Sequence, residues 1–396
     1  MKTIRIKHPA ISIALLSGLC AFGALAQSRV EVMIAQNGIR IEEPGTQRAM
    51  NCLPLEDGSF LIVGMEDTSD KKGEFLLMRL DKNLKLVWRK TWGDAGVDFP
   101  FSIIRSKDGN FLMVGFTTTA DKGLDAWVCK INEAGEILWS RSWGGPGDER
   151  AVSITATTDG NYAIAGQTSE DGRVKGMVAK ISEQGELLWT RSYSFTAIDR
   201  FFGIAEVSHG DLFVSGLSNA NYPDNADVLM VRIGPTGELL WQKQVGSARG
   251  DIAHALIKGR KNSMYLVGYT GELAGSLSDP MIMHVSENGL VIDKTVLQTG
   301  IEARIMYGYI NQDGHKLYCS GYIRDSLDAP WDPLLIEFDL KKGKHNLSRV
   351  KVPESSGELF GIGPNGKSGS LGIGHAVGGN FGSDVLLVKW NHRMEK

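Results

Sequence analysis

Short apolar runs separated by glycine, aspartate and asparagine recur along most of this 396-residue chain. In one stretch, residues 101–104, 111–115, 126–131 and 137–143 form four such runs. Runs this short, bounded by turn residues, are typical of β-strands rather than helices. The pair Asp108-Gly109 predicts a tight turn between the first two strands, because glycine readily adopts a positive φ. The pattern therefore predicts an all-β unit of four antiparallel strands.

The four-strand unit repeats with a period of about 51 residues, which is the separation of Asp108 and Asp159. Its second run is apolar on both faces, as at 111–115, and this predicts a strand covered on both sides by neighbouring sheets. Such units are typical of β-propeller blades, and an open solenoid is the alternative. The turn between the first two strands is marked in seven places, which predicts a seven-bladed propeller; the markers are Asp57, Asp108, Asp159, His209, Asn262, Asp313 and Ser368.

The two ends of the repeat region complement each other. The last unit stops at residues 385–390 and lacks a fourth strand, while Ile39 and Ile41 precede the first unit, where an outer strand is expected. We therefore expect strand 36–42 to lie beside strand 384–390 and close the ring, which leaves no free sheet edge. Because no linker interrupts the repeats, we expect residues 27–396 to form a single propeller domain.

A tryptophan recurs in the predicted outer strand of four units. Four residues after each one lies another large apolar residue, as with Trp139 and Trp143. An even spacing places both side chains on one face of a strand. We therefore expect the recurring tryptophans to pack between or within blades; they are Trp88, Trp139, Trp189 and Trp241.

The first 26 residues have the pattern of a signal peptide. An apolar core at residues 11–24 is followed by a small-x-small cleavage site that ends at Ala26. We therefore expect an exported protein, periplasmic or extracellular. The core is shorter than a typical membrane helix and no other long apolar segment follows, so we expect no membrane span. Leu19 stands where the lipobox of bacterial lipoproteins has a small residue, so we do not expect lipidation of Cys20.

Several function classes are disfavoured by composition and spacing. The net charge is −3 and no basic tract is present, so we expect no nucleic-acid partner. Cys52, Cys129 and Cys319 lack the spacing of a metal finger, and we expect them to be small buried hydrophobes. No paired-histidine metal signature, phosphate loop or nucleophile elbow is present. We therefore expect neither a metal nor a cofactor.

The repeat motif resembles that of secreted bacterial propeller repeats of the delta-60 and related types. In residues 108–145 it comprises Asp-Gly, an apolar run that ends in glycine, and then Gly-Glu followed by two apolar residues and tryptophan. It resembles PQQ-type repeats more loosely, through GEILW and GELLW. The resemblance covers nearly all of residues 27–396 and implies the propeller fold, which serves binding proteins, scaffolds and enzymes alike. Quinoprotein dehydrogenases of similar appearance carry adjacent cysteines, which this chain lacks.

Strand parity predicts which face carries a site. The crossings between blades and the loops between second and third strands share one face, and the crossings deliver the start of each inner strand to the mouth of the channel. Variable loops on a rigid scaffold commonly carry function. We expect the binding residues at this mouth and its rim; they are Arg150, Arg200, His254, Arg304, Tyr307, Tyr222 and Trp331. The nearby acids Glu149 and Asp199 either form strand-end hydrogen bonds or neutralise the arginines.

More than one function class is open at this point. Without a catalytic motif, we expect a monomeric binding protein for a glycan or an envelope protein. The alternative is a polysaccharide-active lyase or hydrolase with His254, Tyr307 and Arg200 in the funnel, since such groups suit proton abstraction from a uronic acid. A third, an outer-membrane assembly scaffold, rests on the loose PQQ likeness. Convergence of these side chains in a deep funnel favours the enzyme, whereas exposed Tyr222 and Trp331 favour sugar stacking.

Overall fold

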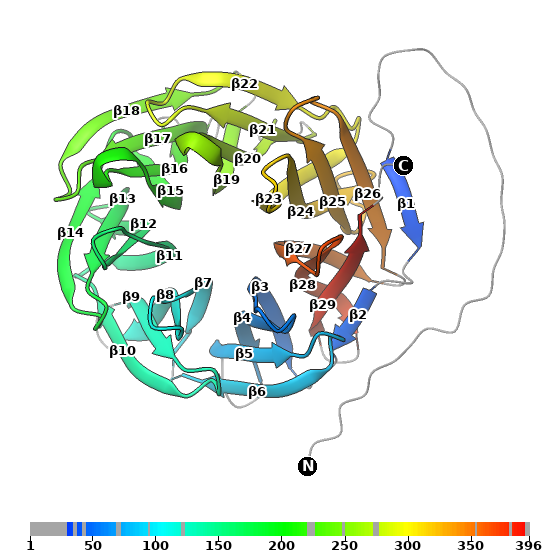
Figure 1. Ribbon diagram of the computed structural model, residues 1–396, viewed down its shortest axis with the longest axis horizontal. Helices are drawn as coiled ribbons and strands as arrows, with labels where there is room; N and C mark the ends of the chain where they lie inside the picture. Colours follow the sequence, from blue (N-terminus) through cyan, green and yellow to red (C-terminus); the bar gives the residue numbers. More distant parts are fainter. Residues whose placement is uncertain are drawn as a thin grey trace.

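A computed structural model describes residues 30–34, 38–41, 45–68, 73–93, 96–119, 123–219, 226–247, 250–271, 277–352, 355–379 and 382–392. These residues form antiparallel sheets arranged as a ring around a central axis, which confirms the all-β propeller (Figure 1). The predicted signal segment and Tyr222 lie outside the described residues. Within the described part of the chain, no helix is long and apolar enough to cross a membrane.

The strands follow one another in four-strand units, each running from the centre of the ring outward, and we letter these units in ring order. Unit A holds β3 (Thr46–Pro54), β4 (Phe60–Asp67), β5 (Glu74–Leu80) and β6 (Leu86–Trp92). Unit B holds β7 (Phe99–Arg105), β8 (Phe111–Thr119), β9 (Gly123–Ile131) and β10 (Ile137–Trp143). Unit C holds β11 (Asp148–Ala156), β12 (Tyr162–Glu170), β13 (Arg173–Ile181) and β14 (Leu187–Tyr193).

The remaining units continue around the ring. Unit D holds β15 (Ile198–Glu206), β16 (Leu212–Asn219), β17 (Asp227–Ile233) and β18 (Leu239–Val245), with the 3₁₀ turn η1 (Ser208–Gly210). Unit E holds β19 (Asp251–Lys258), β20 (Met264–Thr270), β21 (Asp279–Val285) and β22 (Val291–Val296), with η2 (Arg260–Asn262). Unit F holds β23 (Glu302–Ile310), β24 (Lys316–Arg324), β25 (Asp332–Asp339) and β26 (His345–Lys351). Unit G holds β27 (Ser356–Pro364), β28 (Gly369–Gly379), β29 (Gly382–Asn391) and β2 (Gly38–Ile41).

Hydrogen bonding groups the described strands into six sheets, which is one fewer than the seven blades predicted from the turn markers. The difference arises because units C and D share one eight-stranded sheet. Their strands β13 and β15 meet in a single parallel bridge between Val174 and Ile198, at the crossing from one unit to the next.

The ring is closed by strands from both ends of the chain. β2 pairs antiparallel with β29, with Gly38 opposite Val388 and Ile41 opposite Val385, as predicted (Figure 1). A further strand, β1 (Val30–Ile34), pairs parallel with β26 on the outside of unit F. The N-terminal strands therefore complete unit G and cover the outer edge of unit F.

The recurring tryptophans pack across the joints between units. A Cβ added to Gly185, in a turn of unit C, would lie 2.5 Å from Trp139 of unit B. Trp139 and Trp143 both contact the buried cluster between units B and C, which confirms that they share a strand face. Each of the recurring indoles is half-buried rather than fully buried, because it lies in the outer strand.

A β-bulge in every unit shapes the inner strand. In unit C the register shifts between Ala151 and Ser153, so Val152 is the bulged residue. Opposite the bulge, a Cβ added to Gly166 would lie 1.8 Å from the carbonyl oxygen of Arg150. The bulge therefore requires glycine at the end of the second apolar run. The bulged residues are Met50, Phe101, Val152, Phe202, His254, Met306 and Phe360, and the facing glycines are Gly64, Gly115, Gly166, Gly216, Gly268, Gly321 and Gly374.

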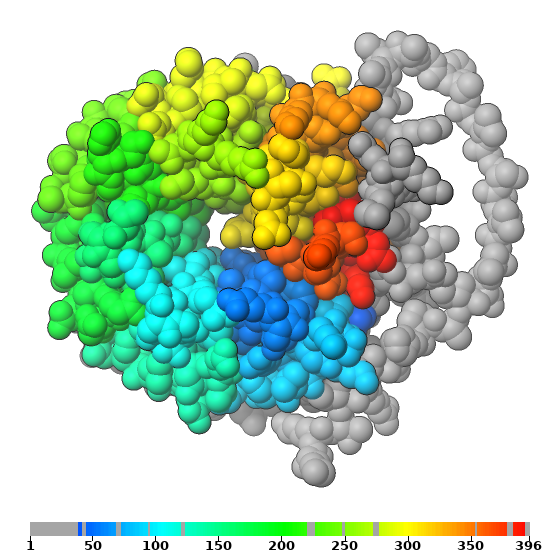
Figure 2. Space-filling view, viewed as in Figure 1, coloured from blue at the N-terminus to red at the C-terminus, as the bar shows by residue number. Residues whose placement is uncertain are grey.

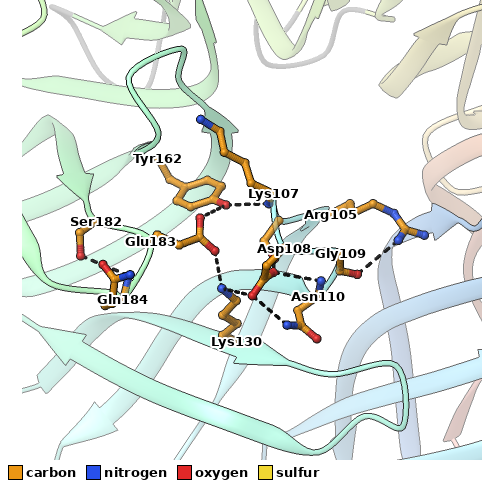
Figure 3. Close-up of polar contacts among 11 residues, drawn as sticks. Arg105, Lys107, Asp108, Gly109, Asn110, Lys130, Tyr162, Ser182, Glu183 and Gln184 are labelled. Carbon is orange, nitrogen blue, oxygen red and sulfur yellow. Dashed lines mark hydrogen bonds and ion pairs between the residues drawn. The ribbon is translucent and has the colours of Figure 1, made fainter.

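The face with the short Asp-Gly turns is held together by polar contacts between units. Lys130 on β9 lies between the carboxylates of Asp108 and Glu183, with its Nζ 2.8 Å from Asp108 Oδ2 (Figure 3). The hydroxyl of Tyr162 donates to Glu183 Oε2 at 2.6 Å and accepts from the amide of Lys107 at 3.1 Å. Asp108, Lys107 and Lys130 belong to unit B, and Tyr162 and Glu183 to unit C. These turns therefore join neighbouring units, as their regular recurrence suggests.

Candidate functional site

The central channel contains a cavity of about 310 Å³. Figure 2 shows the opening at the centre of the ring. The bulged residue of every unit lines the cavity, so the bulges create a belt around its wall. His254 is the polar member of this belt, and the others are Met50, Phe101, Val152, Phe202, Met306 and Phe360. The belt thus combines an apolar wall with one imidazole.

Four of the predicted site residues converge on this cavity. Arg150, Arg200, His254 and Tyr307 all line it, although they come from β11, β15, β19 and β23. Arg150 and Arg200 each stand two residues before the bulge of their strand, nearer to the crossing face. The repeat brings them together because equivalent positions of successive inner strands face the same axis.

The two arginines present unused donors. The Nε atoms of Arg150 and Arg200 are buried and have no hydrogen-bond partner among the described residues. The guanidinium of Arg150 lies over the ring of Phe116, 5.1 Å from its centroid. A buried guanidinium donor without a partner is costly. Because both side chains line the cavity, their positive charge favours an anionic group there, held by charge-assisted hydrogen bonds.

His254 lies between two aromatic rings. Its imidazole stacks on Phe202 and on Tyr269, each with ring centroids 5.4 Å apart. Burial, and then the positive charge of Arg304, lowers the pKa of His254 to about 4. At neutral pH the imidazole is therefore uncharged and able to accept a proton.

Tyr307 lies on the wall next to Asn51, which also lines the cavity. Burial raises the pKa of the Tyr307 hydroxyl, and a hydrogen bond with the Asn51 side chain opposes this only in part. The phenol is therefore protonated at neutral pH and is a proton donor toward the cavity.

Arg304 and Trp331 lie outside this cavity, contrary to the expectation of a single mouth site. Arg304 donates to Glu302 Oε1 at 3.0 Å and to Ser278 Oγ at 3.1 Å, and its guanidinium lies over Tyr269 at 4.5 Å. One face of the Trp331 indole is covered by the guanidinium of Arg324, 4.0 Å from the ring centroid. Trp331 is therefore half-buried rather than fully exposed at the rim, and the neighbouring strand β24 supplies the cation that covers one face of its ring.

The acids beside the arginines serve the crossings between units. Glu149 accepts from the Gly145 amide at 2.8 Å and from Thr168 Oγ1 at 2.5 Å. Asp199 accepts from the Thr196 amide at 2.8 Å. Neither acid forms an ion pair with Arg150 or Arg200 among the described residues. The strand-end interpretation of these acids is therefore correct, and the charge of the two arginines faces the cavity.

The sequence patterns did not single out the apolar belt. Phe101, Phe202 and Phe360 look like ordinary core residues in the inner-strand runs, yet they face the channel. The sequence signal that could have revealed the belt is the glycine that ends the second apolar run of each unit, because this glycine faces the bulge of the inner strand. In the described part of the chain, no group of three or more His, Cys, Asp or Glu side chains is placed to hold a metal ion.

Comparison with known proteins supports the fold and leaves the family open. No family model and no curated protein matches this chain. The WD40 domain of Neurospora crassa Pan2 is similar, with a TM-score of 0.52, 13% identity, and coverage of 90% of this chain and 97% of that one. The polysaccharide lyase Uly1 is similar with a TM-score of 0.52, 11% identity, and 94% coverage of each chain. At this identity the likeness shows the fold alone, and it identifies this chain as a β-propeller repeat protein.

Proposed function

We propose that this protein binds an acidic glycan in its central channel. The observation that carries the proposal is the pair Arg150 and Arg200, which both line the cavity while no described lining residue supplies a counter-charge and their buried Nε donors have no partner among the described residues. Among the described residues that line the cavity there is no carboxylate. Paired guanidinium donors suit the carboxylate of a uronic acid or the sulfate of a sulfated sugar. Phe101, Phe202 and Phe360 add aromatic surface of the kind on which sugar rings pack.

Calorimetric titration with oligogalacturonates tests the binding. Arg150→Ala and Arg200→Ala each remove a charge-assisted hydrogen bond of about 1.5–3 kcal/mol, which corresponds to a roughly ten- to hundredfold weaker Kd. Arg141→Ala is the matched control, because Arg141 is an exposed arginine on the outer strand β10. Equal binding by all three variants, each folded like the parent, would refute the site.

A second candidate is elimination on the bound glycan, as in a polysaccharide lyase. Neutral His254 would take the proton from the carbon next to the uronate carboxylate. The freed electron pair would form the carbon–carbon double bond as the glycosidic C–O bond breaks, and Tyr307 would protonate the departing oxygen. Hydrolysis is favoured less, because most glycosidases need a pair of carboxyl groups and the described cavity lining has none.

Product analysis separates the enzyme from the binding protein. A lyase releases unsaturated uronate, which is detected by mass spectrometry and ultraviolet absorbance. His254→Phe keeps a stacked ring in the belt but removes the base, so it should abolish product while preserving binding. Absence of product from the parent over a panel of acidic polysaccharides would leave binding as the function.

We also propose that the ring is a seven-bladed propeller and that the protein is exported. The blade count is supported by units A to G, each with its own bulge and facing glycine. Export is supported by the basic start, apolar core and cleavage pattern of residues 1–26. Symmetry averaging of electron micrographs tests the blade count. Mass spectrometry of the secreted protein tests for cleavage after Ala26.

A further inference from the structure

The arginine ring at the mouth of the channel is divided into two groups. The position two residues before the bulge is occupied, in ring order from unit A to unit G, by Arg48, Phe99, Arg150, Arg200, Ile252, Arg304 and Glu358. Arg150 and Arg200 are neighbours and form the site described above. Arg48 and Arg304 flank Glu358 in the other group. Phe99 and Ile252 separate the two groups, so the arginines of this register position fall in two groups around the ring.

Glu358 is the one acid of this ring. It lies between units that contribute arginines, and the charges of Arg48, Arg304 and Arg324 all act on its carboxylate. Burial nevertheless raises the pKa of Glu358 above its ordinary value. Within the described chain Glu358 makes no hydrogen bond or ion pair, unlike Glu302, which is held by Ser278 and Arg304. The carboxylate is therefore available to a neighbour or a ligand.

His375 is built into the same cluster. It is 8% exposed and lies directly opposite Glu358 in the β27–β28 register. Its Nδ1 atom is buried and has no hydrogen-bond partner in the described residues. The imidazole stacks on Phe360, with ring centroids 5.4 Å apart. Because Phe360 also lines the cavity, the cluster adjoins the wall of the proposed site.

Arg324 supplies a further unused donor. Its Nε is buried and unpartnered among the described residues, while its guanidinium lies over the ring of Trp331, 4.0 Å from the centroid. Trp331 in turn packs edge-on against Tyr322, with ring centroids 4.6 Å apart. These aromatic contacts fix the direction of the guanidinium without using its hydrogen bonds. Together with His375, the cluster therefore contains two buried polar atoms without a hydrogen-bond partner among the described residues.

We propose that Arg48, Arg304 and Arg324 frame a second acid-binding subsite, so that the ligand of the channel is an oligosaccharide with at least two acidic groups. This inference rests on the proposed function and specifies its substrate class. One acidic group binds Arg150 and Arg200, and another binds the second subsite across the mouth. Glu358 lies among the same three arginines. Its negative charge repels the acidic group of the ligand and so lowers the affinity of the second subsite.

Glu358→Gln and Arg324→Ala test the second subsite by titration with hexagalacturonate and with galacturonate monomer. Removing the like charge in Glu358→Gln should tighten hexagalacturonate binding about tenfold, whereas Arg324→Ala should weaken it about tenfold. Both effects should be smaller for the monomer, which cannot span the mouth. Glu133→Gln, which alters an exposed acid in a turn on the opposite face, is the control and should change neither. Melting temperatures establish that each variant is folded.

The outcomes separate this inference from the proposed function. If Arg200→Ala weakens hexagalacturonate binding while Glu358→Gln and Arg324→Ala do not alter it, the channel site stands and the second subsite is refuted. If the parent binds no galacturonate of either length, the proposed function fails, and inorganic pyrophosphate then tests the subsite directly. Pyrophosphate should bind several-fold more tightly to Glu358→Gln than to the parent and should lose binding in Arg324→Ala. Unchanged pyrophosphate binding in both variants would overturn the subsite.

Discussion

Replacing Gly166 by alanine tests whether the bulge opposite it builds the channel. An alanine Cβ would lie 1.8 Å from the carbonyl oxygen of Arg150, 2.9 Å from its carbonyl carbon and 3.1 Å from the Cα of Ala151. All three neighbours are backbone atoms, so no side chain can swing away. The inner strand must shift by more than an ångström at the residue that aims Arg150 into the cavity.

The expected cost of this shift is about 3 kcal/mol, the upper end of the usual range for overpacking. At roughly 2 °C per kcal/mol for a domain of this size, the melting temperature should fall by about 6 °C. Gly145→Ala is the matched control, because the nearest atom to its added Cβ is Glu149 Oε1 at 3.9 Å. Circular dichroism melts compare the two variants, and titration with an acidic oligosaccharide reports whether Arg150 has moved.

Two results would refute this reasoning. If Gly166→Ala and Gly145→Ala have the same melting temperature, the close approach of the two backbones in the bulge is not needed for the fold. If the fold weakens but oligosaccharide affinity is unchanged, the bulge does not position Arg150. The same substitution at Gly321 places the Cβ 1.9 Å from the Arg304 carbonyl oxygen and should give a similar loss of stability.

Three further predictions concern the joints, the closure and the charge of the channel. Trp139→Ala should cost about 2 kcal/mol, below the usual 3–5 kcal/mol for a fully buried large aromatic because the indole is half-buried, and thermal melts against the parent protein check this value. Deleting residues 27–45 removes β2 and leaves β29 as an edge, so size-exclusion chromatography should show concentration-dependent association. Deleting only 27–36 also removes β1 but keeps β2, so it should associate less than the longer deletion. Equal behaviour of both deletions would contradict closure by β2. The pKa of His254 is about 4 in the folded protein, against an ordinary 6.5. As the pH falls from 6.5 to 4, this histidine is therefore protonated in the unfolded chain but not in the folded one. Stability should therefore decline over that window, and His254→Phe should make the decline shallower in melts at successive pH values; an unchanged slope would show that His254 titrates normally.

Much of the fold was predictable from local patterns. The short apolar runs and the turns such as Asp108-Gly109 predict strands and hairpins, because period and turn chemistry are properties of neighbouring residues. The 51-residue repeat predicts a ring of similar units, and the missing last strand predicts the pairing of β2 with β29. The tryptophan spacing predicts the shared face of Trp139 and Trp143. The number of sheets was not predictable, since one bridge between Val174 and Ile198 merges two units.

The repeat by itself predicts that Arg150, Arg200, His254 and Tyr307 reach one mouth, because they start successive inner strands, but it predicts the same of Arg304, which lies outside the cavity. Only the tertiary structure decided where each residue of an inner strand stands relative to the bulge, and therefore which way its side chain points. In the sequence, Glu358 resembles the acids that follow the glycine turn in other units, so it looks like a strand-end residue. The bulge register instead places it two residues before the bulge, the position that Arg150 and Arg200 occupy in their own strands. The register also turns apolar residues such as Phe360 toward the channel and brings Arg324 over Trp331. A bulge shifts the alternation of side chains by one residue, and whether it forms depends on the partner strand, so the direction of each side chain is fixed only when the strands pair.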